Sequence, residues 1–362
     1  MRPETEAQLA EAIRDAAGPI RVVGGDTRPV GRIAGVPALE TGALRGVVLY
    51  EPAALTLVVR AGTTLAEVEA VLAAEGQRLP FEPMRWGSVL GTAGESTIGG
   101  VVAANVSGPR RVQAGACRDS LIGVRFVDGT GAVVKNGGRV MKNVTGYDLV
   151  KLMAGSWGTL GVLTELAFKV LPKAPAEVTL VLPDLGAGAA VAALSAALGS
   201  PYDVTGAGWM PGVGAVVRVE GLNDSVTYRA GKLAALLARF GEVREERAGS
   251  PALWQSLGEA APLKSQTGDL WRFSLKPSEA PGVIARLAGP VVLDWGGGLI
   301  WAVVPEGCDA RTLAAPFSGH ATWMRGPGAG AFAPEAAPVV ALSAGLRARF
   351  DPRGILNPGR MG

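Results

Sequence analysis

The chain has 362 residues, of which 48% are hydrophobic and 19% charged, and its formal net charge is +3. This length is ordinary for two domains, and a composition this apolar excludes an intrinsically disordered protein. The 52 glycines follow no strict period, which excludes a collagen-like fibre, and the basic residues form only short pairs, which argues against a nucleic-acid surface.

The cysteines and the apolar segments indicate the compartment. Cys117 and Cys308 are far apart in the sequence, which favours a reducing environment without a disulfide framework. The stretch from Met1 to Ala17 has no apolar signal core, and no uncharged apolar run reaches membrane-spanning length. The sequence therefore predicts a soluble, cytoplasmic protein and leaves peripheral attachment to a complex at the inner membrane open.

The N-terminal segment alternates between helical and strand patterns. Residues 4–17 fit an amphipathic helix. Thr64, with Glu67 three residues later, forms a capping box that predicts a helix ending at Gly76. Runs of β-branched and apolar residues predict strands over 20–23, 47–50 and 56–61.

The next segment places glycine-rich stretches between strand signals. The turn Asp128-Gly129-Thr130-Gly131 predicts a hairpin between strands over 121–127 and 132–135. A short helix is expected over 147–153 and a strand over 161–170. Leu171 to Pro175 then forms a natural linker.

The composition shifts after Pro175. A strand, a helix, two strands and a helix follow, and this order begins a ferredoxin-like plait. The expected elements are 177–182, 186–198, 204–210, 213–220 and 225–240. Residues 270–324 again mix strands and a helix, which indicates a second α+β domain, and a helix is expected over 338–350. We see no internal sequence repeat strong enough to claim.

The loop Gly24-Gly25-Asp26-Thr27 directly follows an expected strand. Successive backbone N–H groups in such a turn form a concave anion site, and the Thr27 hydroxyl adds a donor. The loop is neither a G-x-G-x-x-G dinucleotide motif nor a Walker loop, because Gly31 comes late and no Gly-Lys-Ser follows. A tight turn explains it as well as a phosphate cradle does.

A second glycine-rich stretch gives a stronger indication of a ligand. Glycine lets the backbone approach a flat ligand closely, alanine keeps the wall thin, and Asn and Ser side chains offer hydrogen bonds. The alternative is a helix–sheet crossing that requires small residues. We favour the ligand, with the candidate residues Gly91, Ser96, Thr97, Gly99, Gly100, Ala103, Asn105, Ser107 and Gly108.

Three reactive or titratable residue types carry weaker signals. Cys117, in the loop from Gly115 to Asp119, is either a small buried residue or a thiol that faces a cofactor. His320 is the only histidine, so a catalytic triad or a histidine metal site would depend on it alone, and we interpret it as structural or exposed. No Cys or His pair stands at ligand spacing, so no metal site is predicted.

The aromatic residues are concentrated in the second half of the chain. Trp209, Trp271, Trp295 and Trp301 occur on apparent strands. Their default role is core packing, and the alternative is that they line a pocket or a partner surface.

The order of the motifs resembles one superfamily. The motifs are Gly24–Thr27, Ser96–Arg111, Gly115–Asp119, Thr145–Leu149, Gly155–Val162 and the tail Asp351–Gly359. Together they resemble the FAD-binding domain of the PCMH-type (vanillyl-alcohol oxidase) superfamily, and within it the FAD-binding E subunits of bacterial glycolate oxidases. The resemblance covers about residues 18–175 and the C-terminal tail, and the middle matches only in layout.

The resemblance implies an α+β fold. A PCMH-type FAD-binding domain would span residues 1–175, with subdomains at about 18–78 and 79–172 that hold FAD between them. An α+β, ferredoxin-like cap domain would span 176–337 and close over the flavin ring. Residues 338–362 would return to the FAD-binding domain.

The resemblance also implies how FAD is bound. The loop Gly24, Gly25, Asp26 and Thr27 would hold the pyrophosphate through backbone N–H groups. Gly161 and Val162 would lie by the adenine or its ribose. The remaining candidates would line the flavin and the ribityl chain, and Gly115, Cys117 and Asp119 would continue that wall. Covalent members carry a histidine in the first loop, which this chain lacks, so FAD is expected to be noncovalent.

The chain also departs from the family. Members that oxidise D-2-hydroxy acids often carry histidines in the cap, and some of these hold a divalent metal. This cap has only His320, so the usual base is missing and the catalytic residues stay unassigned. Arg272, Arg325 and Lys264 are candidates for binding a carboxylate, and the sequence does not select among them.

The resemblance implies a function in hydroxy-acid oxidation. We expect an FAD-binding subunit of a glycolate oxidase-type 2-hydroxy-acid dehydrogenase complex, acting on glycolate or D-lactate and passing electrons onward. Its partners would be a larger flavoprotein subunit and an iron–sulfur subunit. The alternatives are an autonomous FAD-dependent oxidase or dehydrogenase of a small alcohol or hydroxy acid, and a non-catalytic flavin-binding assembly subunit.

Overall fold

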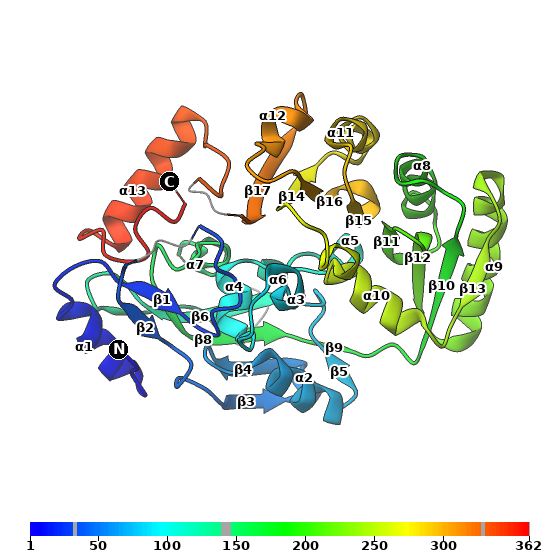
Figure 1. The fold of residues 1–362 in the computed structure, drawn as a ribbon. Helices are drawn as coiled ribbons and strands as arrows, with labels where there is room; N and C mark the ends of the chain where they lie inside the picture. The colour runs from blue at the N-terminus through cyan, green and yellow to red at the C-terminus, as the bar shows by residue number, and fades with distance from the viewer. Residues whose placement is uncertain (32–34, 139–145, 327–329, 362) are drawn as a thin grey trace.

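The computed structural model describes residues 1–31, 35–138, 146–326 and 330–361. We call residues 1–175 together with 351–361 the lower part and residues 176–325 the upper part, after their places in Figure 1. The lower part contains a five-stranded sheet and the upper part an eight-stranded sheet, both antiparallel. Thr145 of the predicted motif lies outside the described residues.

The five-stranded sheet has the order β3-β4-β8-β6-β7. It confirms the predicted strands and the hairpin at Asp128–Gly131. Its strands are β3 (Val47–Glu51), β4 (Thr56–Arg60), β6 (Leu121–Val127), β7 (Val133–Gly137) and β8 (Val162–Lys169). Two small pairs flank it, namely parallel β1 (Arg21–Val23) with β2 (Ala38–Glu40) and antiparallel β5 (Gln77–Arg78) with β9 (Leu171–Pro172).

The helices of the lower part are short and often capped by side chains. They are α1 (Glu6–Arg14), α2 (Leu65–Ala74), α3 (Gly87–Leu90), α4 (Ile98–Ala103), α5 (Arg111–Ala114), α6 (Cys117–Ser120) and α7 (Leu149–Met153). The predicted capping box of α2 is confirmed. The Thr64 hydroxyl accepts from the Glu67 N–H at 3.2 Å, and the Glu67 carboxylate accepts from the Thr64 N–H at 2.9 Å.

The eight-stranded sheet is built from two consecutive β-α-β-β-α-β units. The first is β10 (Ala176–Leu182), α8 (Ala187–Leu198), β11 (Val204–Met210), β12 (Gly214–Gly221), α9 (Asn223–Leu237) and β13 (Arg244–Glu246). The second is β14 (Asp269–Leu275), α11 (Ala280–Leu287), β15 (Val291–Asp294), β16 (Leu299–Val304), α12 (Ala310–Ala314) and β17 (Gly319–Arg325). Helix α10 (Ser250–Gly258) connects them.

The strand order of this sheet is β13-β10-β12-β11-β15-β16-β14-β17. Each half has the fourth strand of its unit beside the first and the third beside the second, which is the ferredoxin-like arrangement. The two halves join where Trp209 of β11 pairs with Leu293 of β15. The predicted plait is therefore confirmed, and the structure adds a second copy that the sequence did not reveal.

The two parts pack against each other along an apolar seam. Helices α8, α9, α11 and α12 lie on the outer face of the eight-stranded sheet, and its inner face meets the lower part (Figure 1). One core cluster spans the seam, with Trp86 and Val89 from the lower part and Trp301 and Val303 from the upper part. The rings of Trp86 and Trp301 meet edge to face at 5.5 Å between centroids.

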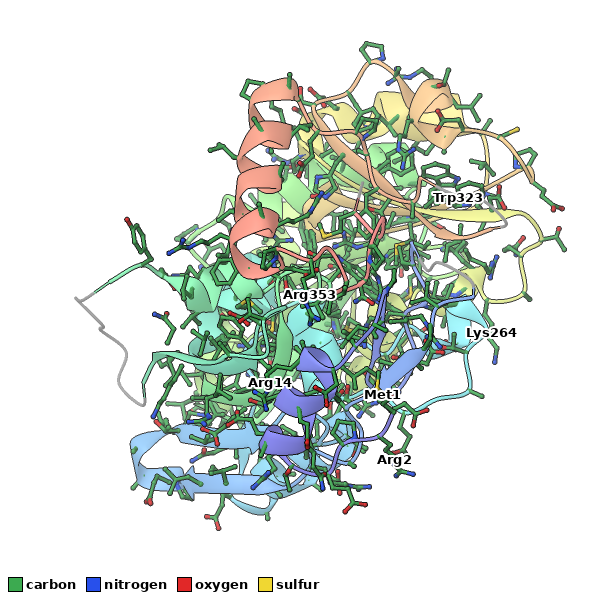
Figure 2. The ribbon with its side chains drawn as sticks, turned by 90° about the vertical axis from the view of Figure 1, so that its left-hand side faces the viewer. Met1, Arg2, Arg14, Lys264, Trp323 and Arg353 are labelled. Carbon is green, nitrogen blue, oxygen red and sulfur yellow. The ribbon has the colours of Figure 1, made fainter. Side chains whose placement is uncertain are left out.

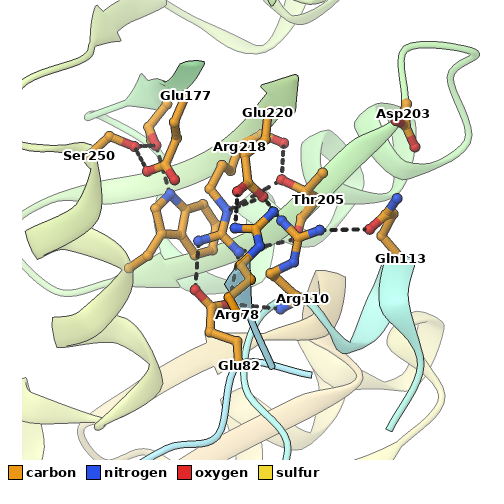
Figure 3. Close-up of polar contacts among 12 residues, drawn as sticks. Arg78, Glu82, Arg110, Gln113, Glu177, Asp203, Thr205, Arg218, Glu220 and Ser250 are labelled. Carbon is orange, nitrogen blue, oxygen red and sulfur yellow. Dashed lines mark hydrogen bonds and ion pairs between the residues drawn. The ribbon is translucent and has the colours of Figure 1, made fainter. Parts of the chain in front are cut away.

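A buried charge network also crosses the seam (Figure 3). We call Arg78, Glu82, Arg110, Arg218 and Glu220 the seam network. The Arg218 guanidinium donates to both oxygens of Glu82 at 2.9 and 2.8 Å, and Arg78 donates to Glu220 at 2.6 Å. Arg110 pairs with the other oxygen of Glu220. Burial alone would lower the pKa of Arg218, but the charges of Glu82 and Glu220 raise it instead.

The C-terminal segment returns to the lower part. Helix α13 (Ala337–Phe350) has no buried residue, which leaves Val339, Val340 and Leu342 exposed. After it, the Arg353 guanidinium donates to the carbonyls of Arg14 at 3.1 Å and Ala16 at 3.2 Å, at the end of α1 (Figure 2). These bonds satisfy carbonyls at a helix end that have no partner within the helix.

Candidate functional site

The lower part contains a cleft of about 690 Å³, counting the portion open to solvent. This volume falls within the usual range for cofactor sites. Its walls come from the first glycine loop, helix α4, the loop before β8 and the C-terminal segment. The lining residues are Val22, Val23, Gly24, Gly25, Asp26, Thr27, Arg28, Thr41, Ala61, Thr97, Gly99, Gly100, Ala103, Trp157, Gly158, Gly161, Val162, Leu163, Asn357 and Arg360.

The two glycine loops of the cleft are pressed together. A Cβ atom on Gly25 would lie 1.5 Å from the Glu95 carbonyl oxygen, and one on Gly94 would lie 1.9 Å from the Gly25 carbonyl oxygen. A Cβ on Gly24 would lie 2.3 Å from the Thr97 hydroxyl. Glycine is therefore required here because two backbones meet, and the contact fixes the loop at the mouth of the cleft.

Helix α4 supplies a thin wall. Gly99 packs against the Ala61 carbonyl, where a Cβ would approach to 2.7 Å. Gly100 is different, because a Cβ there would meet only the Thr97 hydroxyl at 3.3 Å and an Arg28 nitrogen at 3.5 Å. With Ala103 one turn later, Gly100 keeps the cleft wide on this side.

The C-terminal segment closes the other side of the cleft. The Asn357 side chain accepts from the Val22 N–H and donates to the Trp157 carbonyl, both at 2.8 Å. Asp26, Trp157 and Asn357 all have positive φ angles, of 50°, 52° and 44°. Non-glycine residues with this backbone geometry are uncommon and concentrate at functional sites.

Two arginines bring positive charge to the cleft. Arg28 is 7% exposed and donates to the Thr27 hydroxyl at 3.2 Å and the Ser96 hydroxyl at 2.8 Å, while its Nε has no hydrogen-bond partner. Burial lowers the pKa of Arg28 to about 10, so it remains charged at neutral pH. Arg360 stacks over Trp157 at 5.0 Å and donates to the Arg28 carbonyl. These charges favour an anionic ligand.

Ten of the predicted site residues line this cleft. They are Gly24, Gly25, Asp26, Thr27, Thr97, Gly99, Gly100, Ala103, Gly161 and Val162. They come from segments that are far apart in the sequence, as the resemblance implied. Gly161 is also packed against the Phe126 ring, where a Cβ would lie at 2.7 Å.

The other predicted residues lie outside the lining of the cleft. Gly91 ends α3 with a positive φ of 69°. Ser96 accepts from Arg28, and a Cβ on Gly108 would lie 2.2 Å from the Glu82 carbonyl oxygen.

The remaining five lie between the end of α4 and α6. Ser107 accepts from the Cys117 N–H at 2.9 Å, and Asn105 accepts from the Arg118 N–H at 3.1 Å. Asp119 accepts from the Ala116 N–H at 2.9 Å, next to Gly115 with its positive φ of 81°. Cys117 is fully buried, and burial raises the pKa of its thiol, so it behaves as a packing residue.

The sequence did not single out several cleft residues. Arg28, Trp157, Asn357 and Arg360 come from or adjoin motifs that supported the resemblance, yet no local pattern assigned them to a ligand. An arginine directly after a glycine loop was the available signal for Arg28. Asn357 and Arg360 become recognisable only once the tail is placed against β1.

A second polar feature lies at the seam. The Arg272 guanidinium lies 5.2 to 5.9 Å from the ring centroids of Trp86, Trp295 and Trp301. Its Nε is buried without a hydrogen-bond partner. Burial, followed by the charge of Arg111, lowers the pKa of Arg272 to about 10. We call Arg272 and these three tryptophans the arginine cage.

The other candidates for carboxylate binding have different environments. Arg325 donates to the carbonyls of Val89 at 2.8 Å and Gln266 at 2.9 Å, so it is held by backbone. Lys264 is exposed on the outside of the molecule (Figure 2). His320 lies at the exposed start of β17. Partial desolvation of its imidazole and, to a smaller extent, the charges of Arg272 and Arg111 lower its pKa.

Within the described ranges, no three His, Cys, Asp or Glu side chains gather as metal ligands would. Both cysteines are free thiols. Every helix in the described part of the chain is too short or too polar to cross a bilayer.

The comparisons with known proteins agree with this geometry. A family model described as an FAD binding domain matches residues 1–137. The solved structure of an alkyldihydroxyacetonephosphate synthase superposes with a TM-score of 0.69 at 15% identity, over 99% of this chain and 76% of that one. The fold and the site thus define a PCMH-type FAD-binding flavoprotein.

A closer relative narrows this class. The chain is 37% identical over 357 residues to glycolate oxidase subunit GlcE of Escherichia coli (strain K12), covering 98% of this chain and 95% of that one. The chain belongs to this family of FAD-linked oxidoreductase subunits. A shorter match, 44% identical over 88 residues, relates it to a D-lactate dehydrogenase of Anaerostipes hadrus, covering 24% of this chain and 18% of that one.

Proposed function

We propose that this chain binds FAD noncovalently in the cleft and acts as the FAD-binding subunit of a glycolate oxidase-type complex. One observation carries this proposal. In a chain 37% identical to GlcE over almost its whole length, glycine loops and two arginines from distant segments converge on one cleft. A tight turn alone would not require the Gly24 loop, α4 and the tail to meet.

The residues present fit the cofactor. The Gly24–Thr27 backbone and Arg28 would hold the pyrophosphate, because N–H groups and a guanidinium both complement its negative charge. Gly100 and Ala103 would leave room for the flat ring, and Asn357 would brace the loops around it. When bound, the flavin supplies a hydride acceptor for the alcohol carbon of a hydroxy acid.

The proposed binding is noncovalent because of what the cleft contains. Among its described lining residues there is no histidine, cysteine or tyrosine that could bond to the flavin. Cys117, the nearest candidate from the sequence, is fully buried beside Ser107 and does not line the cleft.

We also propose domain roles for the two parts. Residues 1–175 would form the FAD-binding domain, and residues 176–337 the cap over the flavin. Residues 338–362 would return to complete the cleft, as the hydrogen bonds of Asn357 and Arg360 support. The seam network and the apolar seam would hold the cap in one orientation.

The names of the relatives support the proposed substrate, and the family resemblance supports the proposed partners. The proposed complex contains a larger flavoprotein subunit and an iron–sulfur subunit, and it oxidises glycolate or D-lactate. This chain would contribute its flavin to that oxidation and to the onward transfer of electrons. Attachment to the inner membrane, if present, would come through the complex.

The first experiment tests the cleft. Purified wild-type protein should show the absorbance of oxidised flavin, and acid precipitation should release that flavin into the supernatant. Gly100→Trp should abolish the absorbance because the indole fills the cleft, whereas Gly100→Ala should retain it because a Cβ fits there with small adjustments. Circular dichroism checks that both variants are folded. Stoichiometric flavin in a folded Gly100→Trp variant would contradict the proposed site.

The second experiment tests the role as a subunit. Steady-state turnover of glycolate and D-lactate, with a dye acceptor, is measured for the isolated chain and for the chain co-expressed with its two proposed partners. We expect turnover only with the partners. Fast turnover by the isolated chain would instead support an autonomous dehydrogenase.

A further inference from the structure

The arginine cage lies on the face of the upper sheet that meets the lower part. Arg272 of β14 pairs with Trp301 of β16 on one side and with Thr322 of β17 on the other. Trp301 belongs to the core cluster that spans the seam, while Trp271 and Phe273 belong to the cluster under the outer helices. Because side chains alternate along a strand, Arg272 points toward the lower part.

The same face carries other polar side chains beside Arg272. Ser274 is two residues along β14 and pairs with His320 of β17, so Arg272, Ser274, Thr322 and His320 share one face. Thr322 is 8% exposed, whereas His320 is exposed. Arg272 and Ser274 are half-buried, so this row of polar side chains extends from the seam to solvent at His320.

In the part of the chain that the structure describes, no acidic side chain pairs with Arg272. Among the described residues no ion pair and no hydrogen bond involves its side chain, although Nε is buried. A buried guanidinium usually requires a carboxylate, because desolvation is costly. The ring faces of Trp86, Trp295 and Trp301 compensate only in part, through cation–π attraction.

A second arginine joins the cage from the lower part. The Arg111 guanidinium of α5 stacks on the Trp295 ring at 4.3 Å, and Arg272 is 5.2 Å from the same ring. The nearby acid is Asp294, whose carboxylate accepts from the Trp295 N–H at 2.7 Å. Burial raises the pKa of Asp294 to about 7, so it is an incomplete counter-ion at neutral pH. The site therefore has an excess of positive charge.

The Trp86 indole lies between the arginine cage and the cleft. The Trp86 ring lies 5.4 Å from Arg28, which lines the cleft, and 5.9 Å from Arg272. A ligand on Arg272 would therefore sit next to the wall of the proposed FAD site, on the side of the upper part.

We propose that Arg272, assisted by Arg111, binds the carboxylate of a small hydroxy acid at the seam. This inference rests on the proposed function and specifies the substrate group that the site recognises. The planar guanidinium can donate two parallel hydrogen bonds to a carboxylate, which a lysine cannot match.

The test uses the full-length chain loaded with FAD. Isothermal titration measures the binding of glycolate and, as a neutral analogue, of ethylene glycol. Arg272→Met should weaken glycolate binding at least tenfold. The affinity of Arg272→Lys should lie between those of the wild type and Arg272→Met, because lysine keeps the charge but cannot donate two parallel hydrogen bonds to the carboxylate. Arg239→Met is the matched control, since Arg239 also stacks on an aromatic ring, Phe240, but on the exposed surface. Its affinity should equal that of the wild type.

Two results would overturn the inference. One is wild-type glycolate affinity in Arg272→Met, and the other is ethylene glycol binding as tightly as glycolate. Flavin absorbance of each sample separates this inference from the proposed function. A wild-type protein without flavin contradicts the proposed function, whereas one with flavin but without glycolate binding contradicts only the role of Arg272. If Arg272→Met loses its flavin, Arg272→Lys decides by the same criteria.

Discussion

Two arginines at the same seam have opposite environments. Arg218 is 2% exposed and donates to both oxygens of Glu82, and it lies 3.5 Å from Glu220 (Figure 3). Arg272 is surrounded by indole rings and has no acidic partner among the residues described. Arg272 is half-buried, and burial by itself lowers the pKa of both groups. The charges of Glu82 and Glu220 nevertheless raise the pKa of Arg218 above its ordinary value, whereas the pKa of Arg272 falls to about 10.

This difference distinguishes a structural role for Arg218 from a role of Arg272 in ligand binding. A buried charge whose hydrogen bonds are all made inside the protein fixes the packing of two parts and has nothing left for a ligand. A buried charge without a partner costs stability, and such sites are common where a ligand completes the set. The two arginines therefore predict opposite responses to the same substitution.

The largest effect is expected for Arg218→Met. Removing this guanidinium leaves the carboxylates of Glu82 and Glu220 with fewer cations at the seam, which should lower the free energy of unfolding by about 3–5 kcal/mol. Urea denaturation followed by circular dichroism measures it. If the free energy of unfolding fell by less than about 1 kcal/mol, the seam network would not be structural and the contrast with Arg272 would be wrong.

The second prediction concerns Asp294 and pH. Burial raises its folded-state pKa from 3.8 to about 7, so the native state holds a proton that the unfolded state releases. The contribution of Asp294 to the free energy of unfolding is therefore fully present below pH 3.8. It decreases as the pH rises toward 7, by up to about 1.4 kcal/mol per pH unit. Asp294→Asn keeps the oxygen that accepts from the Trp295 N–H and should remove this slope.

The wild-type and Asp294→Asn proteins are compared by urea denaturation from pH 4.5 to 8. Their difference in unfolding free energy should change up to about pH 7 and then stay constant. Parallel curves over the whole range would show that Asp294 is ionised in the native state, and that Arg272 has a full counter-ion nearby.

The third prediction is the counterpart of the first. Arg272→Met should leave the unfolding free energy unchanged or raise it by about 1 kcal/mol, because the lost cation–π attraction is offset by removing an unpaired buried charge. The measurement is the same as for Arg218→Met. A loss of more than about 2 kcal/mol would show that Arg272 is as structural as Arg218.

The smallest effect is expected at an exposed pair. Glu242 and Arg244 are bonded at 2.7 Å on the surface of the upper part, with 55% and 63% of their side chains exposed. Glu242→Gln should leave the unfolding free energy unchanged within the error of the measurement, because solvent and salt screen such pairs. A measurable loss would mean that exposed ion pairs also stabilise this protein, and the effect of Arg218→Met could then not be attributed to burial alone.

Local patterns in the sequence predicted much of the fold. The capping box of Thr64 and Glu67 and the hairpin at Asp128–Gly131 depend on residues a few positions apart, and the structure confirms both. The first ferredoxin-like unit also followed from element order. The second did not, because β15 and α12 have only 4 and 5 residues and leave little periodicity to detect.

The site was predictable only in part, for a physical reason. Gly24, Thr97 and Gly161 stood out because small residues cluster around them in the sequence. Arg28, Asn357 and the unpaired state of Arg272 depend on contacts between segments tens to hundreds of positions apart. Conversely, close backbone packing by itself requires glycine at Gly25, Gly94 and Gly99. The sequence cannot distinguish a glycine needed for packing from one needed for a ligand, whereas the structure can.

The bracing of the first loop by Asn357 has a consequence for synthesis. The hydrogen bond from the Val22 N–H spans 335 positions, so the ribosome makes almost the whole chain before this bond can form. Chains generally fold from the N-terminus as they emerge. The Gly24 loop therefore lacks the hydrogen bonds of Asn357 until translation reaches the tail. Nascent chains arrested before Asn357 should be unable to retain the flavin.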